Sequence, residues 1–139
     1  IPDPDLRPVL SLRTTVAQLR TIPQGSTVSY NRTFTAKRQT RIAVLPIGYA
    51  DGYSRRLSHR GSVLIQGRRA PIAGLVCMDM SMVDVTDFET VQVGETVTLI
   101  GRQGQESIWA DEVADWIGTI PYEVLCGIGS RVPRLYESA

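Results

Sequence analysis

The chain has 139 residues, enough for one domain, and its 42% hydrophobic and 21% charged residues are typical of a globular protein. The formal net charge is +1, yet residues 1–71 hold 12 Lys and Arg against 3 Asp and Glu, while residues 72–139 hold 3 against 11. This balance disfavours a nucleic-acid-binding domain, which is usually basic overall. The simplest explanation of the uneven charge distribution is that these charged side chains lie on a solvated surface. The alternative is a basic face that binds an anion or an acidic partner.

The sequence carries no recognisable targeting or membrane signal. No apolar run approaches the roughly 18 residues of a membrane span, and the opening IPDPDLRP does not read as a signal peptide. Two cysteines, Cys77 and Cys126, are too few for a disulfide scaffold and favour a reducing compartment. We therefore expect a cytoplasmic protein that does not enter the membrane.

The elements expected along the chain are mostly strands, because Val, Ile and Thr make up 37 residues. Residues 1–8 hold three prolines and are expected to form a linker from an upstream domain, followed by one β domain over 9–139. A turn is predicted at 23–26, and a turn-rich segment with one short helical turn at 50–61. Strands are predicted at 9–22, 27–36, 41–49, 80–88, 91–101, 122–128 and 131–136, with a hairpin at 62–74 around Gln66 and Gly67.

One helix is predicted, over residues 110–118. Val113, Trp116 and Ile117 lie at helical spacing, acidic residues occupy the first turns, and Gly118 follows as a stop signal. About eight strands and one short helix predict a mainly β, barrel-like domain with the helix packed on its side.

Several classes of catalytic site find no support in the sequence. His59 is the only histidine and lies in an Arg-rich loop, and the two cysteines form no C-x-x-C pair, so we expect no metal site. There is no P-loop and no G-x-G-x-x-G motif. Acid–base chemistry would therefore depend on Tyr, Cys, Asp, Glu or Lys37, which is the only lysine.

Three segments attract interest for local reasons. Tyr30 lies in a strand near several cations, which favour the phenolate form of a tyrosine, although a half-buried strand tyrosine is the commoner situation. Tyr49 lies between glycines that let the backbone approach a ligand, or that simply make a tight turn. Residues 77–79 (CMD) stand between two strands, where unpaired N–H groups can bind an anion, unless Cys77 and Met78 merely pack the barrel.

Taken together, the motifs of this chain resemble the C-terminal domain of bacterial alanine racemase. The resemblance covers residues 6–136, in the order and spacing of that family. It rests on 28–30 (VSY), 33–36 (TFTA), 45–55 (LPIGYADGYSR), 69–72 (RAPI), 76–79 (VCMD), 82–86 (MVDVT), 99–101 (LIG), 122–126 (YEVLC) and 131–134 (RVPR).

The resemblance implies a fold, a cofactor and a set of site residues. Alanine racemases are two-domain, pyridoxal-phosphate enzymes that act as head-to-tail homodimers, in which the C-terminal domain completes the active site of the partner subunit. By this resemblance Tyr30 is the second catalytic base, and Tyr49 and Tyr122 line the substrate entry. Tyr122 also reaches the cofactor phosphate. The backbone N–H of Met78 binds the substrate carboxylate, with Asp79 beside it.

The chain departs from the family pattern at Asn31, where glycine is common, and at Met80, where glutamine is common. The lysine that holds the cofactor belongs to the N-terminal (α/β)₈ barrel, and no family motif places it at Lys37. We therefore expect this chain alone to be inactive. A racemase of serine or of several amino acids is an alternative, which Tyr122 disfavours by narrowing the entry. A non-enzymatic β-barrel binding module would leave the motifs unexplained.

Overall fold

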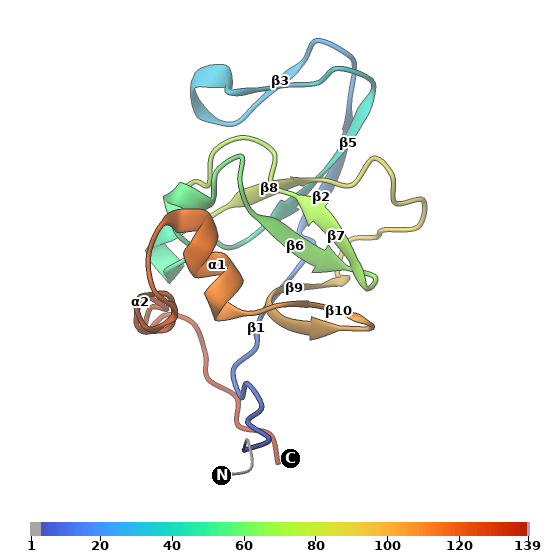
Figure 1. Cartoon of the computed structure of the whole chain (residues 1–139). Coiled ribbons are helices and arrows are strands. Elements are labelled where there is room, and N and C mark those ends of the chain that lie inside the picture. Colours follow the sequence, from blue (N-terminus) through green and yellow to red (C-terminus); the bar gives the residue numbers. More distant parts are fainter. Residues whose placement is uncertain (1–3, 139) are drawn as a thin grey trace.

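The computed structural model describes residues 4–138, and Figure 1 shows their arrangement. The strands are β1 (Leu12–Thr15), β2 (Gln18–Ile22), β3 (Thr27–Val28), β4 (Phe34–Thr35), β5 (Thr40–Leu45), β6 (Ser62–Ile65), β7 (Arg68–Pro71), β8 (Ser81–Asp84), β9 (Thr96–Gln103) and β10 (Glu106–Ile108). The helices are α1 (Ala110–Ile117) and α2 (Pro121–Cys126), and three 3₁₀ turns are η1 (Tyr30–Arg32), η2 (Tyr49–Asp51) and η3 (Arg55–Leu57).

The strands form antiparallel sheets that enclose one core. The first sheet has the order β1-β9-β6-β7 with β10 paired to β9, the second has the order β2-β5-β8, and β3 pairs with β4. An isolated bridge between Ile72 and Val83 connects the first sheet to the second. Residues 16–17 lead directly from β1 to β2, so the two larger sheets are also joined at their other side. The mainly β fold class is confirmed.

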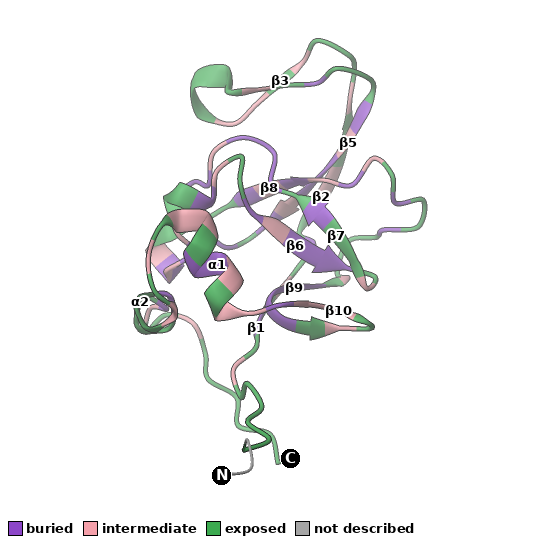
Figure 2. Cartoon of the chain, in the orientation of Figure 1, coloured by how far each residue is buried: buried purple, intermediate pink, exposed green. Residues whose placement is uncertain are grey.

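The core lies between these sheets and the helices, where Figure 2 shows buried residues along β5, β6, β8 and β9. All of Val63, Leu64 and Ile65 are buried, which is expected where a strand is covered on both faces. The β3–β4 hairpin projects from the domain in Figure 1, and residues 4–9 and 133–138 are exposed. The chain therefore carries its exposed loops on a well-packed scaffold.

Two predicted elements are confirmed by their backbone geometry. Gln66 and Gly67 have φ of 52° and 70°, which is the pattern of the tight turn that matches the twist of a hairpin. Helix α1 ends at Gly118, whose φ of 73° places it in the left-handed conformation of a helix stop. The residues of the two turns thus determine where the hairpin reverses and where α1 ends.

The predicted strand at 27–36 is wrong as a continuous element. Ser29, Asn31 and Arg32 have φ of 71°, 59° and 52°, so the chain reverses at η1 and leaves only the short strands β3 and β4. The alternating pattern therefore covers two strands and the turn between them. Positive φ at residues other than glycine is uncommon, which is why the pattern gave no sign of the turn.

The two strands predicted near the C-terminus are also wrong. Residues 122–126 belong to α2, so residues 4–138 contain two α-helices where we predicted one; Pro121 starts the helix and Val124 is buried against the core. Residues 131–136 form no strand. There the Arg134 guanidinium donates hydrogen bonds to the carbonyl oxygens of Ile128, Gly129 and Val132, and it thereby holds the segment in an irregular turn.

The remaining expectations differ mainly in their limits. The segment 9–22 is two strands, the strand predicted at 41–49 ends at Leu45 before Pro46, and the helical segment at 50–61 holds one complete 3₁₀ turn and the end of another. The strand predicted at 80–88 is the shorter β8, the one at 91–101 is displaced to β9, and β10 was missed. The linker at 1–8 stays a prediction; residues 1–3 lie outside the described residues, and residues 4–8 form no helix or strand.

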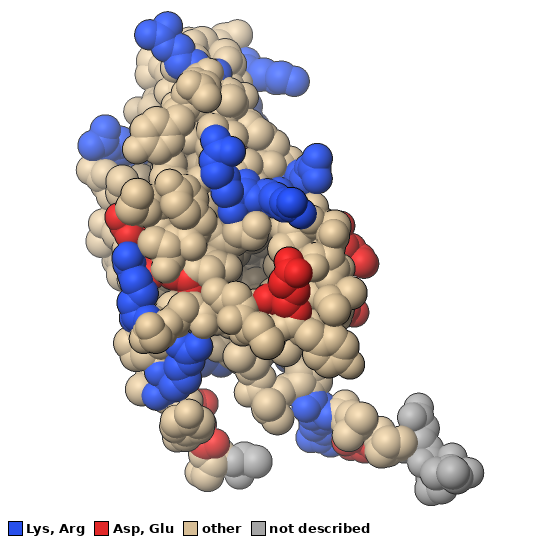
Figure 3. All heavy atoms as spheres, turned by 90° about the vertical axis from the view of Figure 1, so that its left-hand side faces the viewer, with Lys and Arg blue, Asp and Glu red and all other residues tan. Residues whose placement is uncertain are grey.

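Charges from the two halves of the sequence meet in ion pairs. Arg69 pairs with Glu112 at 2.7 Å and with Glu106 at 3.1 Å. These contacts raise the pKa of its guanidinium, and the hydrogen bond that Arg69 donates to Glu112 contributes most. Arg38 pairs with Asp87 at 2.8 Å. Figure 3 shows both signs of charge on one face of the domain. The uneven distribution along the sequence is therefore partly neutralised within the fold.

Trp116 packs against the core but is only partly buried. Complete burial would make Trp116→Ala cost about 3–5 kcal/mol. With part of the indole exposed, we expect the free energy of unfolding to fall by about 1–2 kcal/mol. Urea denaturation of the chain measures this difference. A loss of 3–5 kcal/mol would mean that the indole is fully enclosed in solution.

Candidate functional site

Tyr30 stands at the tip of the β3–β4 hairpin, in turn η1. Its side chain is 69% exposed, and its hydroxyl has no hydrogen-bond partner within residues 4–138. Asn31 has φ of 59°, and asparagine is among the non-glycine residues that adopt this left-handed conformation most readily. Asn31, which stands where glycine is common in the family, is therefore compatible with the turn that exposes Tyr30.

Ser29 fastens this turn to the loop between β7 and β8. Its hydroxyl donates a hydrogen bond to the carbonyl oxygen of Leu75 at 3.0 Å and accepts one from the N–H of Leu75 at 3.1 Å. The Ser29 hydroxyl also lies 3.8 Å from the sulfur of Cys77. The residue before Tyr30 is thus clamped to the loop that carries Cys77, Met78 and Asp79.

The same loop is held from the other side by η2. The N–H of Tyr49 donates to the carbonyl oxygen of Cys77, and the N–H of Ala50 donates to that of Met78, both at 3.0 Å. A Cβ atom on Gly48 would lie 2.1 Å from the Cys77 carbonyl oxygen, so only glycine permits this approach. Met78 is 54% exposed, and its own N–H has no acceptor within residues 4–138. That N–H is available to an anion.

Asp79 is held by an ion pair that the sequence did not suggest. Arg131 contacts Asp79 at 2.7 Å through Nη2 and Asp51 at 2.9 Å through Nε. The second oxygen of Asp51 accepts a hydrogen bond from the N–H of Gly48 at 3.0 Å. Asp51 and Arg131 both lie in the motifs of the resemblance, which was the one signal that could have identified them.

Tyr122 lies on α2, and its side chain is 75% exposed. The end of α2 contacts the segment after η2, because a Cβ atom on Gly52 would lie 2.0 Å from the carbonyl oxygen of Gly127. The structure therefore joins the segments of Tyr30, Tyr49, Met78 and Asp79 by hydrogen bonds. It joins Tyr122 to them only through the packing of its helix. The chemical roles of these five residues stay predictions.

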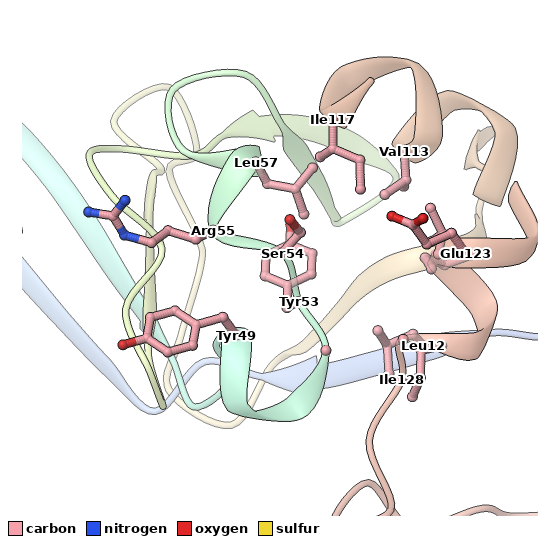
Figure 4. Close-up of a pocket in the computed structure, with 14 residues that line it drawn as sticks. Leu12, Tyr49, Tyr53, Ser54, Arg55, Leu57, Val113, Ile117, Glu123 and Ile128 are labelled. Carbon is pink, nitrogen blue, oxygen red and sulfur yellow. The ribbon is translucent and has the colours of Figure 1, made fainter. Parts of the chain in front are cut away.

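A cavity of about 320 Å³ lies beside this group, between β1, η2, η3 and the two helices. Figure 4 shows the carboxylate of Glu123 turned inward, whereas the hydroxyl of Tyr49 points away from the centre. Burial raises the pKa of Tyr53, which lines the cavity, so this tyrosine stays neutral and makes a poor base. The cavity lining does not include Tyr30, Met78 or Asp79, so the cavity is not the candidate site.

Within residues 4–138, His, Cys, Asp and Glu side chains form no group of three or more that could hold a metal ion. No helix in the same residues combines the length and the apolar character needed to cross a membrane.

The fold and the site together define a class of protein: a β domain that presents an exposed tyrosine and a free backbone N–H on hydrogen-bonded loops at its surface. Comparison with known proteins gives the particular family. Residues 9–136 match the family model described as "Alanine racemase, C-terminal domain". The chain belongs to this family.

The relatives and solved structures agree with that assignment. The chain is 50% identical to alanine racemase of Halothermothrix orenii and 51% identical to that of Geobacter sulfurreducens, covering 96% and 94% of this chain. Each match covers 35% of the relative, so the chain spans about a third of the length of these curated relatives.

Two crystal structures show the same fold. Alanine racemase from Bacillus anthracis with bound L-Ala-P superimposes with a TM-score of 0.91 at 47% identity, over 96% of this chain and 34% of that one. Alanine racemase from Bartonella henselae with covalently bound pyridoxal phosphate gives 0.86 at 37% identity, over 91% and 34%.

Proposed function

We propose that this domain is the C-terminal part of a pyridoxal-phosphate-dependent alanine racemase of the bacterial cytoplasm, which interconverts L- and D-alanine for peptidoglycan synthesis. The observation that carries the proposal is that hydrogen bonds join the turn of Tyr30 to the loop that carries Met78. Tyr30 is therefore exposed near the free N–H of Met78. The names of the relatives, and the pyridoxal phosphate bound in the Bartonella henselae structure, support it.

The residues of this chain would serve one side of the reaction. Pyridoxal phosphate, when bound, withdraws electrons from Cα and so stabilises negative charge there. Tyr30 would act on one face of Cα, its phenolate removing the proton and its hydroxyl returning one. The N–H of Met78 would hold the substrate carboxylate, and Tyr49 would orient the substrate at the entry. The base for the opposite face, a lysine, would come from outside this chain.

The residues present fit a part of the cofactor site. The exposed hydroxyl of Tyr122 is a suitable donor to a phosphate oxygen. Lys37 does not fit as the residue that holds the cofactor, because it lines a separate depression with Phe34, Arg38 and Asp84, which contains none of the site residues. The chain supplies a phosphate contact and not the covalent attachment.

From this we expect that the chain alone neither retains pyridoxal phosphate nor racemises alanine. The measurement is the visible absorption of the chain after incubation with the cofactor and dialysis. A Lys37→Ala variant is the matched control, because Lys37 is the only lysine of this chain to which the cofactor could attach. A retained band that disappears in Lys37→Ala would contradict the expectation and assign the cofactor to this domain.

The exposure of the site residues supports a partner that covers them. More than half of the surface of each of Tyr30, Met78 and Tyr122 is exposed in this chain. Proton transfer at Cα works best away from bulk water, so a covering surface is expected. The covering surface would be the barrel domain of a second subunit in a head-to-tail homodimer. Exposed large apolar side chains are typical of such interfaces.

A racemase assay of the full protein that contains this domain tests the proposal. We expect interconversion of L- and D-alanine, with a larger kcat/KM for alanine than for serine. Activity on serine alone would establish the serine racemase alternative. Absence of racemisation of any amino acid in the cofactor-loaded protein would leave a non-enzymatic binding module.

A further inference from the structure

Arg131 connects two carboxylates that belong to different loops. Its Nη2 lies 2.7 Å from Oδ1 of Asp79, and its Nε lies 2.9 Å from Oδ1 of Asp51. The hydrogen bond with Asp79, followed by the charge of Asp51, raises the pKa of the Arg131 guanidinium, which therefore stays positive. One cation thus compensates two anions at the edge of the candidate site.

Arg131 itself is held in place by backbone contacts. The N–H of Gly129 donates to the carbonyl oxygen of Asp51 at 2.8 Å, and the N–H of Val132 donates back to the carbonyl oxygen of Gly129 at 3.2 Å. Arg134 donates to the carbonyl oxygens of Ile128 and Val132 at 2.9 and 2.7 Å. The segment that carries Arg131 is therefore fastened to η2 independently of its ion pairs.

The Met78 N–H has a fixed direction. The carbonyl oxygen of Cys77 accepts a hydrogen bond from the N–H of Tyr49, and the peptide bond from Cys77 to Met78 is trans. In a trans peptide the C=O and the N–H point in opposite directions, so the N–H of Met78 points away from η2. The next residue in the chain is Asp79, whose negative charge would repel an anion bound at this N–H unless a cation compensates it.

We propose that Arg131 is a positioning residue that makes this site accept an anion: it neutralises Asp79 and holds it toward Asp51, so that the Met78 N–H can receive the substrate carboxylate. The inference rests on the proposed function. It concerns recognition of the carboxylate and not proton transfer, so loss of Arg131 should weaken substrate binding far more than it slows turnover.

The test uses the full racemase that contains this domain, with propionate as a probe, because propionate is alanine without its amino group. Titration calorimetry gives the Kd for propionate, and initial rates give KM and kcat for alanine. We expect Arg131→Gln to raise both Kd and KM by about tenfold, because the uncompensated carboxylate of Asp79 then repels the bound anion, while kcat stays within about threefold.

The electrostatic part of the proposal is tested by removing the second charge. We expect the double variant Arg131→Gln/Asp79→Asn to bind propionate within about threefold of the wild type, because the uncompensated carboxylate is gone. Arg131→Lys keeps one positive charge and should raise Kd by only about threefold. If Arg131→Gln does not fold, the comparison of Arg131→Lys with Arg131→Lys/Asp79→Asn carries the same test.

A matched control is Arg38→Gln, which removes another exposed arginine that pairs with an aspartate, Asp87, at 2.8 Å. It should leave Kd, KM and kcat unchanged. The inference is wrong if Arg131→Gln leaves the Kd for propionate within twofold, or if Asp79→Asn does not restore binding. A wild-type enzyme that does not racemise alanine would overturn the proposed function and this inference together, whereas failure confined to the variants overturns only the inference.

Discussion

Tyr30→Phe in the full racemase should abolish proton exchange on one face of Cα and leave exchange on the other face. The substitution keeps the ring and removes only the hydroxyl, and loss of a general base costs about 10²–10⁴-fold in rate. Because that hydroxyl bonds to nothing within residues 4–138, the midpoint of unfolding should not change. Cofactor binding should hardly change either, since the lysine that holds the cofactor is expected elsewhere.

Solvent deuterium incorporation, started separately from L-alanine and from D-alanine, measures the two faces independently. Tyr49→Phe is the first comparison and should change KM, because Tyr49 is expected to orient the substrate. Met78→Ala is the second and should have little effect, because the proposed donor is its backbone N–H. If Tyr30→Phe slows both directions by no more than about threefold, which is less than 1 kcal/mol, Tyr30 is not the base.

Gly48→Ala should destabilise the fold strongly and displace the loop that carries Met78. The new Cβ would lie 2.1 Å from the carbonyl oxygen of Cys77 and 2.4 Å from that of Met78, and both are backbone atoms that cannot rotate away. Separation of the two loops would break the hydrogen bonds from Tyr49 and Ala50. Overpacking costs about 1–3 kcal/mol and each lost hydrogen bond about 1 kcal/mol, so we expect a loss of about 3–5 kcal/mol.

Urea denaturation of the chain gives this free energy, and KM for alanine in the full enzyme reports the displaced Met78 loop. Gly129→Ala is a matched control in the same region, because its Cβ would lie 3.4 Å from the carbonyl oxygen of Ala50, an ordinary contact. It should cost less than about 1 kcal/mol. Equal stability losses in the two variants would show that the close approach at Gly48 is not what holds the loops together.

Elements with strong local signals were predictable from the sequence. The hairpin around Gln66 and Gly67 and the helix α1 follow from turn residues and from hydrophobic spacing, and their hydrogen bonds join residues close in the chain. The strand predicted at 122–128 was wrong because the apolar residues of this segment suit a strand as well as a helix. Burial of Val124 against the core decided for the helix, and Pro121 at its first position was the signal overlooked.

The sequence by itself determined the mainly β class and, through its motifs, the residues expected at the site. Only the tertiary structure decided how these residues are held. Ser29 is bound to Leu75, Tyr49 to Cys77, and Arg131 to both Asp51 and Asp79. These partners are separated by 28 to 80 positions in the sequence. They meet because the sheets close around one core, and the pattern of neighbouring residues carries no information about contacts of that range.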